Sequence, residues 1–285
     1  MSHQLRATSV PRPRAVKRGQ VIFFLVTSPS PLLRFGALPL VIAHRGASAH
    51  APENTSPAFA AAWAAGAQWI ETDVQVSIDG VPVLIHDDTA DRTAGAPGPI
   101  GSFTAAELAQ LDAGSWFHES FAGCPVPTLE HLLTKMPTGG QVLLEIKGPH
   151  TPAQLAAELA VIDSAGAADR VFLQSFETQA LLDLRPLVGD SAVGLLVEHI
   201  HEDPVAACFR YGAISYNPDY QALLAAPQIV AQLHAEGISV LVYTCDEPDG
   251  WEALTAIGVD GIITNDPAAL IAWQKGAVTT YAVAT

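Results

Sequence analysis

The sequence predicts an α/β protein, a (β/α)8 TIM barrel in which eight parallel strands alternate with helices. Short apolar runs rich in β-branched residues alternate with Ala- and Leu-rich segments of helical length, and there are eight such runs. A chain of 285 residues is long enough for one barrel of this kind. The expected strands are Val41–His44, Trp69–Val74, Val142–Lys147, Val171–Ser175, Ala192–Val197, Ala213–Tyr216, Ser239–Thr244 and Gly261–Thr264.

The helices between these strands are predicted from the residues at their ends. Ser56-Pro57 places a capping hydroxyl before a proline in the first helical turn, and Gly66 follows where that helix should end. Other prolines and glycines mark further starts and ends in the same way, namely Pro152, Pro204, Pro227, Pro248 and Pro267 for starts, and Gly166, Gly237 and Gly258 for ends.

Two irregularities follow the second strand. Val74–Ser77 and Val81–His86 flank Asp79-Gly80, which is typical of a tight turn and predicts a hairpin that brings His86 back toward the second strand. Residues 87–126 are too long for an ordinary βα loop, so we expect a small insertion over the barrel mouth.

The insertion contains one helical segment, Thr104–Leu111, and a group of aromatic residues. Trp116 and Phe117 have two possible roles here. They either form a wall of the substrate cleft or belong to a small core within the insertion itself.

The charge of the chain is distributed unevenly. Residues 1–39 contain six basic residues and no acidic residue, although the formal net charge of the whole chain is −15. The rest of the chain is therefore strongly acidic and repels nucleic acid, which we exclude as a partner. We expect residues 1–38 to be a basic, disordered leader and residues 39–285 to form the single barrel domain.

Localisation is predicted from the leader and the cysteines. The apolar run Val21–Val26 is shorter than the core of a signal peptide, and no run reaches the ~20 apolar residues of a membrane span. Three scattered cysteines without CxxC spacing favour a reducing compartment. We expect a cytoplasmic protein, and a periplasmic or secreted one if the leader is a signal.

Five titratable side chains lie at the ends of apolar runs: His44, Glu71, Asp73, His86 and Glu145. Charged groups in buried strands are costly, so they are usually paired, bound to a metal or catalytic. Barrel enzymes place their sites at the carboxyl ends of the strands, where these residues are expected to meet.

The three acids predict a metal site. Glu71 and Asp73 are two residues apart and point to the same side of a strand, and Glu145 lies on the neighbouring strand. Carboxylates that converge without a cation raise one another's pKa. One hard divalent cation with oxygen ligands, Mg²⁺ or Ca²⁺, resolves this repulsion better than zinc does.

His44 and His86 are candidates for a general acid and a general base, since histidine titrates near neutral pH. Arg45 and Lys147 supply positive charge that suits a phosphate. Two other roles for Lys147 remain open: it either pairs structurally with Glu145 or forms a Schiff base in an aldolase-like lyase.

The sequence resembles the glycerophosphodiester phosphodiesterase family over about residues 40–272. The motifs that carry the resemblance follow the family's order along the chain. They are His44-Arg45-Gly46, Pro52-Glu53-Asn54-Thr55, Glu71-Thr72-Asp73-Val74-Gln75, Asp79-Gly80, His86-Asp87, Arg92-Thr93, Leu111-Asp112-Ala113-Gly114-Ser115-Trp116, Pro127-Thr128-Leu129-Glu130, Leu144-Glu145-Ile146-Lys147, Ser175-Phe176 and Gly258-Val259-Asp260-Gly261-Ile262-Ile263-Thr264.

This resemblance implies a phosphodiesterase barrel that uses a metal to hydrolyse small glycerophosphodiesters to glycerol 3-phosphate and an alcohol. It implies that the three acids bind the metal, that the two histidines transfer protons, that Arg45 and Lys147 bind phosphate, and that Phe176 lines the substrate cleft. Asn265 departs from the pattern, since an acid is expected after the last strand.

In the mechanism that the resemblance implies, the substrate's own 2-hydroxyl attacks and gives a cyclic phosphate, and direct attack by water is the alternative. We expect His44 to act as the base and His86 as the acid. Two further functions stay open beside the lyase: lysophospholipase D-like cleavage of a lysophospholipid at the same site, and phosphate binding without catalysis.

Overall fold

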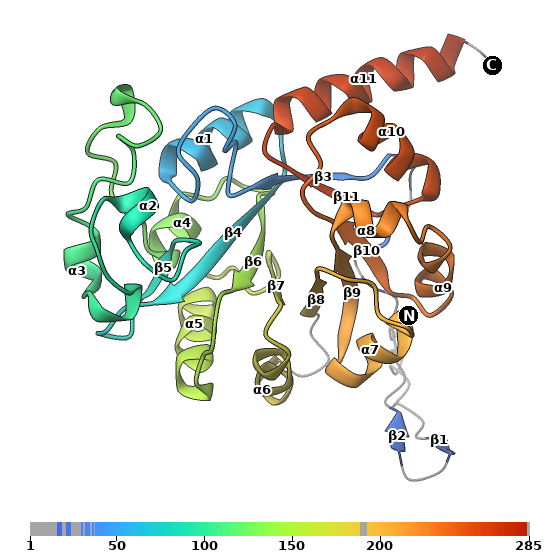
Figure 1. Cartoon of the computed structure of the whole chain (residues 1–285), viewed down its shortest axis with the longest axis horizontal. Coiled ribbons are helices and arrows are strands. Elements are labelled where there is room, and N and C mark those ends of the chain that lie inside the picture. The colour runs from blue at the N-terminus through green and yellow to red at the C-terminus, as the bar shows by residue number, and fades with distance from the viewer. Residues whose placement is uncertain are drawn as a thin grey trace, which may run out of the picture.

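The computed structural model describes residues 16–18, 21–23, 30, 32–34, 36, 38–188 and 193–283. Its main sheet is a closed barrel of parallel strands (Figure 1). The strands are β3 (Leu40–His44), β4 (Trp69–Val76), β6 (Gln141–Ile146), β7 (Val171–Ser175), β8 (Val193–Val197), β9 (Ala213–Pro218), β10 (Ser239–Val242) and β11 (Gly261–Thr264). The barrel closes because β3 pairs with both β11 and β4. The predicted TIM barrel is confirmed, and Ala192, its expected first residue of one strand, lies outside the described residues.

Helices follow the strands around the outside of the barrel (Figure 1). They are α1 (Ser56–Ala65), α4 (Leu129–Lys135), α5 (Pro152–Ser164), α6 (Thr178–Val188), α7 (Pro204–Tyr211), α8 (Tyr220–Leu224), α9 (Ile229–Ala235), α10 (Pro248–Ile257) and α11 (Pro267–Val283). Most predicted helix ends are found where expected, but Thr55 and not Ser56 is the N-cap of α1, and it forms no side-chain capping hydrogen bond. Pro57 lies in the first turn of α1, and Gly66 ends that helix with a left-handed φ of 97°. No helix in the described part of the chain has both the length and the apolar character needed to cross a membrane.

The predicted hairpin is present, since β5 (Pro82–Leu84) pairs antiparallel with the end of β4. The insertion that follows contains α2 (Asp91–Ala94), η1 (Ile100–Ser102), α3 (Ala105–Leu108) and η2 (Glu119–Phe121). Helix α3 is shorter than predicted and begins at a capping box between Thr104 and Glu107. Outside the barrel, β1 (Val16–Arg18) pairs antiparallel with β2 (Val21–Phe23). The expected disordered leader is corrected at its end, because the Ser30 hydroxyl bonds that of Ser239 at 2.9 Å and Leu32 is buried in an apolar cluster of the barrel. Most other leader residues lie outside the described residues.

Alternation along the strands decides which side chains enter the barrel. Ile42 and Leu143 belong to an apolar cluster that also contains Phe172, Leu241 and Ile263, and this cluster forms the floor of the barrel interior. Residues two positions farther along β3 and β6 point inward above that floor. The fold thereby places the strand-end polar residues over an apolar base, at the barrel's carboxyl end.

Candidate active site

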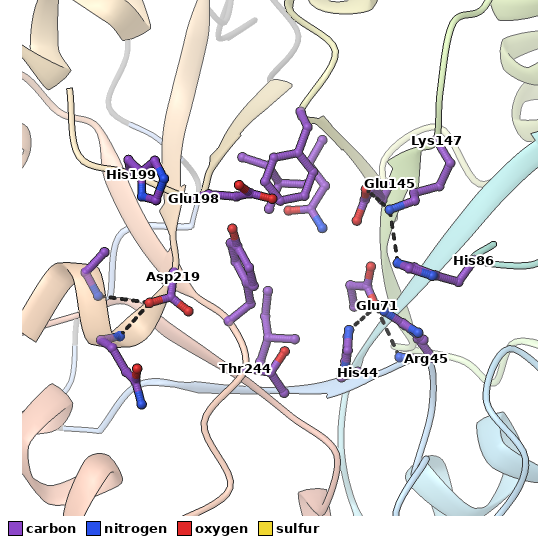
Figure 2. A pocket seen from close by; sticks show the side chains of 17 residues that line it. His44, Arg45, Glu71, His86, Glu145, Lys147, Glu198, His199, Asp219 and Thr244 are labelled. Carbon is purple, nitrogen blue, oxygen red and sulfur yellow. Dashed lines mark hydrogen bonds and ion pairs between the residues drawn. The ribbon is translucent and has the colours of Figure 1, made fainter. Parts of the chain in front are cut away.

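A pocket of about 780 Å³ opens at the carboxyl end of the barrel (Figure 2). Seven of the eight predicted site residues line it, which are His44, Arg45, Glu71, His86, Glu145, Lys147 and Phe176. The eighth, Asp73, lies beneath them and is fully buried. The structure therefore brings all the predicted site residues together in one place.

The three carboxylates form a tight buried group. Glu71, Asp73 and Glu145 each offer an oxygen within 4.8 Å of the others, because Asp73 is the direct register partner of Glu145 across β4 and β6. Burial, and then the charges of Asp73 and Glu145, raise the pKa of Glu71 well above its ordinary value. Burial and the charge of Asp73 raise the pKa of Glu145 to about 7. Such a group requires positive charge to stay ionised.

The donor atoms of this group fit a divalent cation. Oxygen Oδ1 of Asp73 is buried and has no hydrogen-bond partner among the described residues. The other oxygen, Oδ2, accepts a hydrogen bond of 2.8 Å from the Asn54 amide, which directs Oδ1 away from it. An all-oxygen carboxylate set is the type of site that Mg²⁺ and Ca²⁺ prefer.

Asn54 orients Asp73, a contact not predicted from the sequence. Its backbone adopts a left-handed φ of 56°, and its Oδ1 accepts hydrogen bonds from the Thr72 hydroxyl at 2.6 Å and from the Asp73 amide at 3.3 Å. The sequence signals for it are its place in the Pro52-Glu53-Asn54-Thr55 motif and the tolerance of asparagine for this conformation.

His44 is held by an amide. Its Nδ1 lies 2.7 Å from Oδ1 of Asn265, an atom that only accepts, so the proton of the neutral ring sits on Nδ1. Its Nε2 lies 4.0 Å from Oε2 of Glu71, on the pocket side. Burial, and then the charge of Arg45, lower the pKa of His44 to about 4. His44 is therefore a neutral imidazole at pH 7 with a free lone pair on Nε2.

His86 is held by a carboxylate instead. Its Nδ1 donates to Oδ1 of Asp87 at 2.7 Å, and its Nε2 lies 3.1 Å from Nζ of Lys147 (Figure 2). An ammonium only donates, so Nε2 accepts in this arrangement. The two histidines therefore approach the pocket with the same ring atom but have different partners behind them.

The two cations of the site are tied to the acids. Arg45 has a left-handed φ of 55°, and its Nε lies 3.3 Å from Oδ2 of Asp73. Lys147 forms an ion pair of 3.0 Å with Glu145. Burial alone would lower the pKa of Lys147, but the charges of Glu145 and Asp73 outweigh it and raise the pKa above its ordinary value. A permanently charged lysine does not suit a Schiff base.

The opposite wall of the pocket combines polar and aromatic side chains (Figure 2). Glu198 and His199 follow β8, and Asp219 follows β9. Phe176 packs edge to face against Tyr243 with ring centroids 5.7 Å apart. These residues also lie at strand ends, so the same positional rule that identified Glu71 would have found Glu198 and Asp219.

Trp116 and Phe117 do not line the pocket, so the first of the two roles that the sequence left open is wrong. Phe117 packs edge to face against both Trp116 and Phe121, with ring centroids 5.7 Å apart in each pair. The three rings form a small cluster within the insertion, separate from its fully buried core, and Trp116 is 42% exposed.

Comparison with known proteins places this site in a family. Residues 44–269 match the model of the glycerophosphoryl diester phosphodiesterase family. The chain is 36% identical to a glycerophosphodiester phosphodiesterase of Caldanaerobacter subterraneus over 81% of this chain and 96% of that protein. A glycerophosphodiester phosphodiesterase of Agrobacterium tumefaciens has a similar structure, with a TM-score of 0.74, 30% identity and coverage of 82% of this chain and 100% of the other.

A second solved structure extends the comparison. It is a phosphodiesterase of Oleispira antarctica in complex with its product sn-glycerol-3-phosphate, with a TM-score of 0.79, 30% identity and coverage of 84% of this chain and 97% of the other. The resemblance found in the sequence is thus confirmed, and this chain belongs to the glycerophosphoryl diester phosphodiesterase family.

Proposed function

We propose that the protein hydrolyses small glycerophosphodiesters to sn-glycerol 3-phosphate and an alcohol. The observation that carries this proposal is the buried group of three carboxylates directly beside two histidines and two cations, in a chain of this family. The Oleispira relative, which binds sn-glycerol-3-phosphate, supports a substrate of this class.

Glu71, Asp73 and Glu145 are proposed to hold one divalent cation, Mg²⁺ or Ca²⁺. When bound, the cation neutralises the acidic group and stabilises negative charge on phosphate oxygens. The raised pKa values of Glu71 and Glu145 and the orphaned oxygen of Asp73 support this assignment. Arg45 and Lys147 are proposed to bind the phosphate, Arg45 through the N–H groups of its planar guanidinium and Lys147 through the charge of its ammonium.

His44 is proposed to be the general base. Its neutral ring presents the Nε2 lone pair to the pocket, ready to remove a proton from the attacking hydroxyl. That hydroxyl belongs to the substrate's glycerol, which gives a cyclic phosphate that water then opens, or to water itself. The base serves both routes in the same way.

His86 is proposed to be the general acid. The carboxylate of Asp87 accepts the hydrogen bond of Nδ1 and so orients the ring with Nε2 toward the pocket. To act as the acid, Nε2 takes up a proton from solvent in place of the hydrogen bond that it accepts from Lys147. As the bond from phosphorus to the head-group oxygen breaks, this proton passes to the departing oxygen.

The wall opposite the cations favours a polar head group over an acyl chain. Glu198 and Asp219 lie there. Phe176, whose ring centroid is 5.9 Å from Nζ of Lys147, is proposed to line the substrate cleft. Carboxylates solvate hydroxyl and amine groups well and apolar chains badly. This supports a glycerophosphodiester as substrate rather than the lysophospholipid of a lysophospholipase D.

The domain and its compartment are proposed on separate grounds. Residues 39–285 form the catalytic domain, since every site residue lies within them. Cys124, Cys208 and Cys245 are all free thiols, which supports a reducing compartment such as the cytoplasm.

A coupled assay for glycerol 3-phosphate tests the proposed function. We expect release from glycerophosphocholine, glycerophosphoethanolamine and glycerophosphoglycerol, and little choline release from lysophosphatidylcholine at equal metal. A protein that cleaves only the lysophospholipid would be a lysophospholipase D. A protein inactive on all four with Mg²⁺, Ca²⁺ and Mn²⁺ would contradict the enzyme assignment and favour phosphate binding without catalysis.

A further inference from the structure

Arg92 lies between two carboxylates and binds both of them with paired donors. Its Nε and Nη2 donate to Oδ2 and Oδ1 of Asp87 at 2.6 and 2.8 Å. Its Nη1 and Nη2 donate to Oε2 and Oε1 of Glu53 at 2.9 and 2.8 Å. One planar guanidinium therefore fixes the direction of two carboxylates at once.

Each of these carboxylates holds one side chain of the pocket. Oδ1 of Asp87 accepts the hydrogen bond from Nδ1 of His86 at 2.7 Å. Oε1 of Glu53 accepts a hydrogen bond of 2.7 Å from Nη1 of Arg45. A continuous chain of charged contacts thus runs from the proposed acid, through Arg92, to the proposed phosphate-binding arginine.

Arg92 itself stays outside the pocket. It is in α2 of the insertion and does not line the cavity, and its side chain is 44% exposed. Trp116 lies over its guanidinium at 5.8 Å, so this aromatic side chain supports Arg92 from the insertion. The ion pair with the largely buried Glu53 adds stability, but the more exposed pair with Asp87 adds little, so a role in geometry explains that second contact better than a role in stability.

The two side chains at the ends of this chain need such support. Gln75 fixes the backbone near His86 by donating to the carbonyls of His86 and Asp87 at 3.1 and 2.6 Å, but the imidazole still turns about its own side-chain bonds. Two contacts hold the ring, that of Nε2 with Lys147 and that of Nδ1 with Asp87. Among the described residues, Arg92 is the one other side chain bonded to the carboxylate of Asp87. Small errors in such positions are expensive, since a displacement of about 1 Å costs on the order of 100-fold in rate.

We propose that Arg92 is a positioning residue that sets the imidazole of His86 and the guanidinium of Arg45 relative to each other. Both groups can then contact the same phosphodiester. Arg92 touches neither the substrate nor the reacting atoms. The inference rests on the proposed function, in which His86 protonates the leaving oxygen.

Two substrates that share the glycerol phosphate and differ in the leaving group test this proposal. Choline is a poor leaving group that needs the acid, whereas p-nitrophenolate leaves without a proton. For R92A we expect kcat to fall about 10- to 100-fold with glycerophosphocholine, and less than 5-fold with the p-nitrophenyl ester of glycerol phosphate. Displacement of Arg45, which binds the phosphate common to both esters, should raise KM for both alike. An equal loss of kcat with both esters would show a general structural effect and overturn the proposal.

A double-mutant cycle gives a second readout. If Arg92 acts partly through His86, removing Arg92 in the H86A background should lower kcat by a much smaller factor than in wild type. Fully additive losses would overturn the proposal. R92K keeps the charge but not the fork, so it should recover only part of the lost kcat.

The matched control is R210A. Arg210 also lies 5.8 Å over an aromatic ring, that of Tyr211, but it does not line the pocket. We expect R210A to keep wild-type kcat with both esters. A thermal melt of each variant should be measured to check that it folds. A wild-type protein that is inactive on both esters would contradict the proposed function itself. An active wild type, with an R92A loss of kcat that is equal for the two esters, would contradict only the role of Arg92.

Discussion

His44 and His86 are both anchored through Nδ1 at 2.7 Å, the first by an amide oxygen and the second by a carboxylate. This difference underlies the roles that we propose for the two rings. The amide of Asn265 carries no charge that would offset a positive ring, and burial holds the pKa of His44 at about 4. His86 has the carboxylate of Asp87 behind it instead. We therefore propose His44 as the base and His86 as the acid.

The first prediction concerns the histidines. H44A and H86A should each lower kcat on glycerophosphocholine by about 10²- to 10⁴-fold, because each removes one proton transfer. Metal affinity, measured by calorimetry, should stay near the wild-type value, since neither ring belongs to the acidic group. H131A, which removes an exposed histidine from α4, serves as the control. Near-normal kcat in either pocket variant would disprove the pairing.

The second prediction concerns the repulsion among the acids. E71Q removes one of three buried like charges, so the metal-free variant should melt a few °C above the metal-free wild type. Added Mg²⁺ or Ca²⁺ should raise the melting temperature of the wild type but barely change that of E71Q. Differential scanning fluorimetry in EDTA and in metal measures both effects. Equal stabilisation of both proteins by metal would contradict the site.

The third prediction concerns the pH dependence of stability. Burial opposes ionisation of Glu53, but Arg92 and Arg45 outweigh it and hold its pKa at about 2, below the ordinary 4.5. A lowered carboxyl pKa adds stability that is present above pH 4.5 and is lost as the pH falls toward 2. E53Q should therefore be less stable than wild type at pH 7 by at most about 3 kcal/mol.

Chemical denaturation across pH 7 to 3 checks this prediction. The difference in unfolding free energy between wild type and E53Q should shrink steadily below pH 4.5. A difference that stays constant, or grows, as the pH falls would show that the pKa of Glu53 is not lowered by its arginine partners.

The fourth prediction concerns the glycine beside Arg45. Gly46 has a φ of +85°, and a methyl group there would lie 2.6 Å from the carbonyl carbon of Ala58. G46A should destabilise the protein by more than about 2 kcal/mol and displace Arg45. Gly66 has a similar φ of +97°, but a methyl group there would meet only Cδ1 of Ile271 at 3.9 Å, so G66A should cost only about 1 kcal/mol. An equal loss of unfolding free energy for G46A and G66A in urea denaturation would show that backbone strain alone, and not the contact with Ala58, matters at Gly46.

Much of the fold and site is predictable from local pattern. The strand ends at His44, Glu71 and Glu145 follow from apolar runs, and alternation puts their side chains inside the barrel. The turn at Asp79-Gly80 likewise predicts the hairpin that returns His86 to the site.

Other features depend on loops that meet only in the folded chain. Arg92 reaches Glu53 across 39 residues of sequence, and Asn54 reaches Asp73 through a left-handed backbone. No periodicity links such residues, so their pairing cannot be derived from spacing. The same holds for Trp116, whose exposed ring lies 5.8 Å from the guanidinium of Arg92, a contact that no hydrophobic pattern predicts.

Glycerol 3-phosphate release by metal-stripped protein tests the central claim most directly. Protein treated with EDTA and freed of chelator should release none from glycerophosphocholine, and titration with Mg²⁺ or Ca²⁺ should restore turnover to a plateau as a single site fills. Undiminished release in EDTA, or restoration in a variant that lacks all three of Glu71, Asp73 and Glu145, would contradict the account.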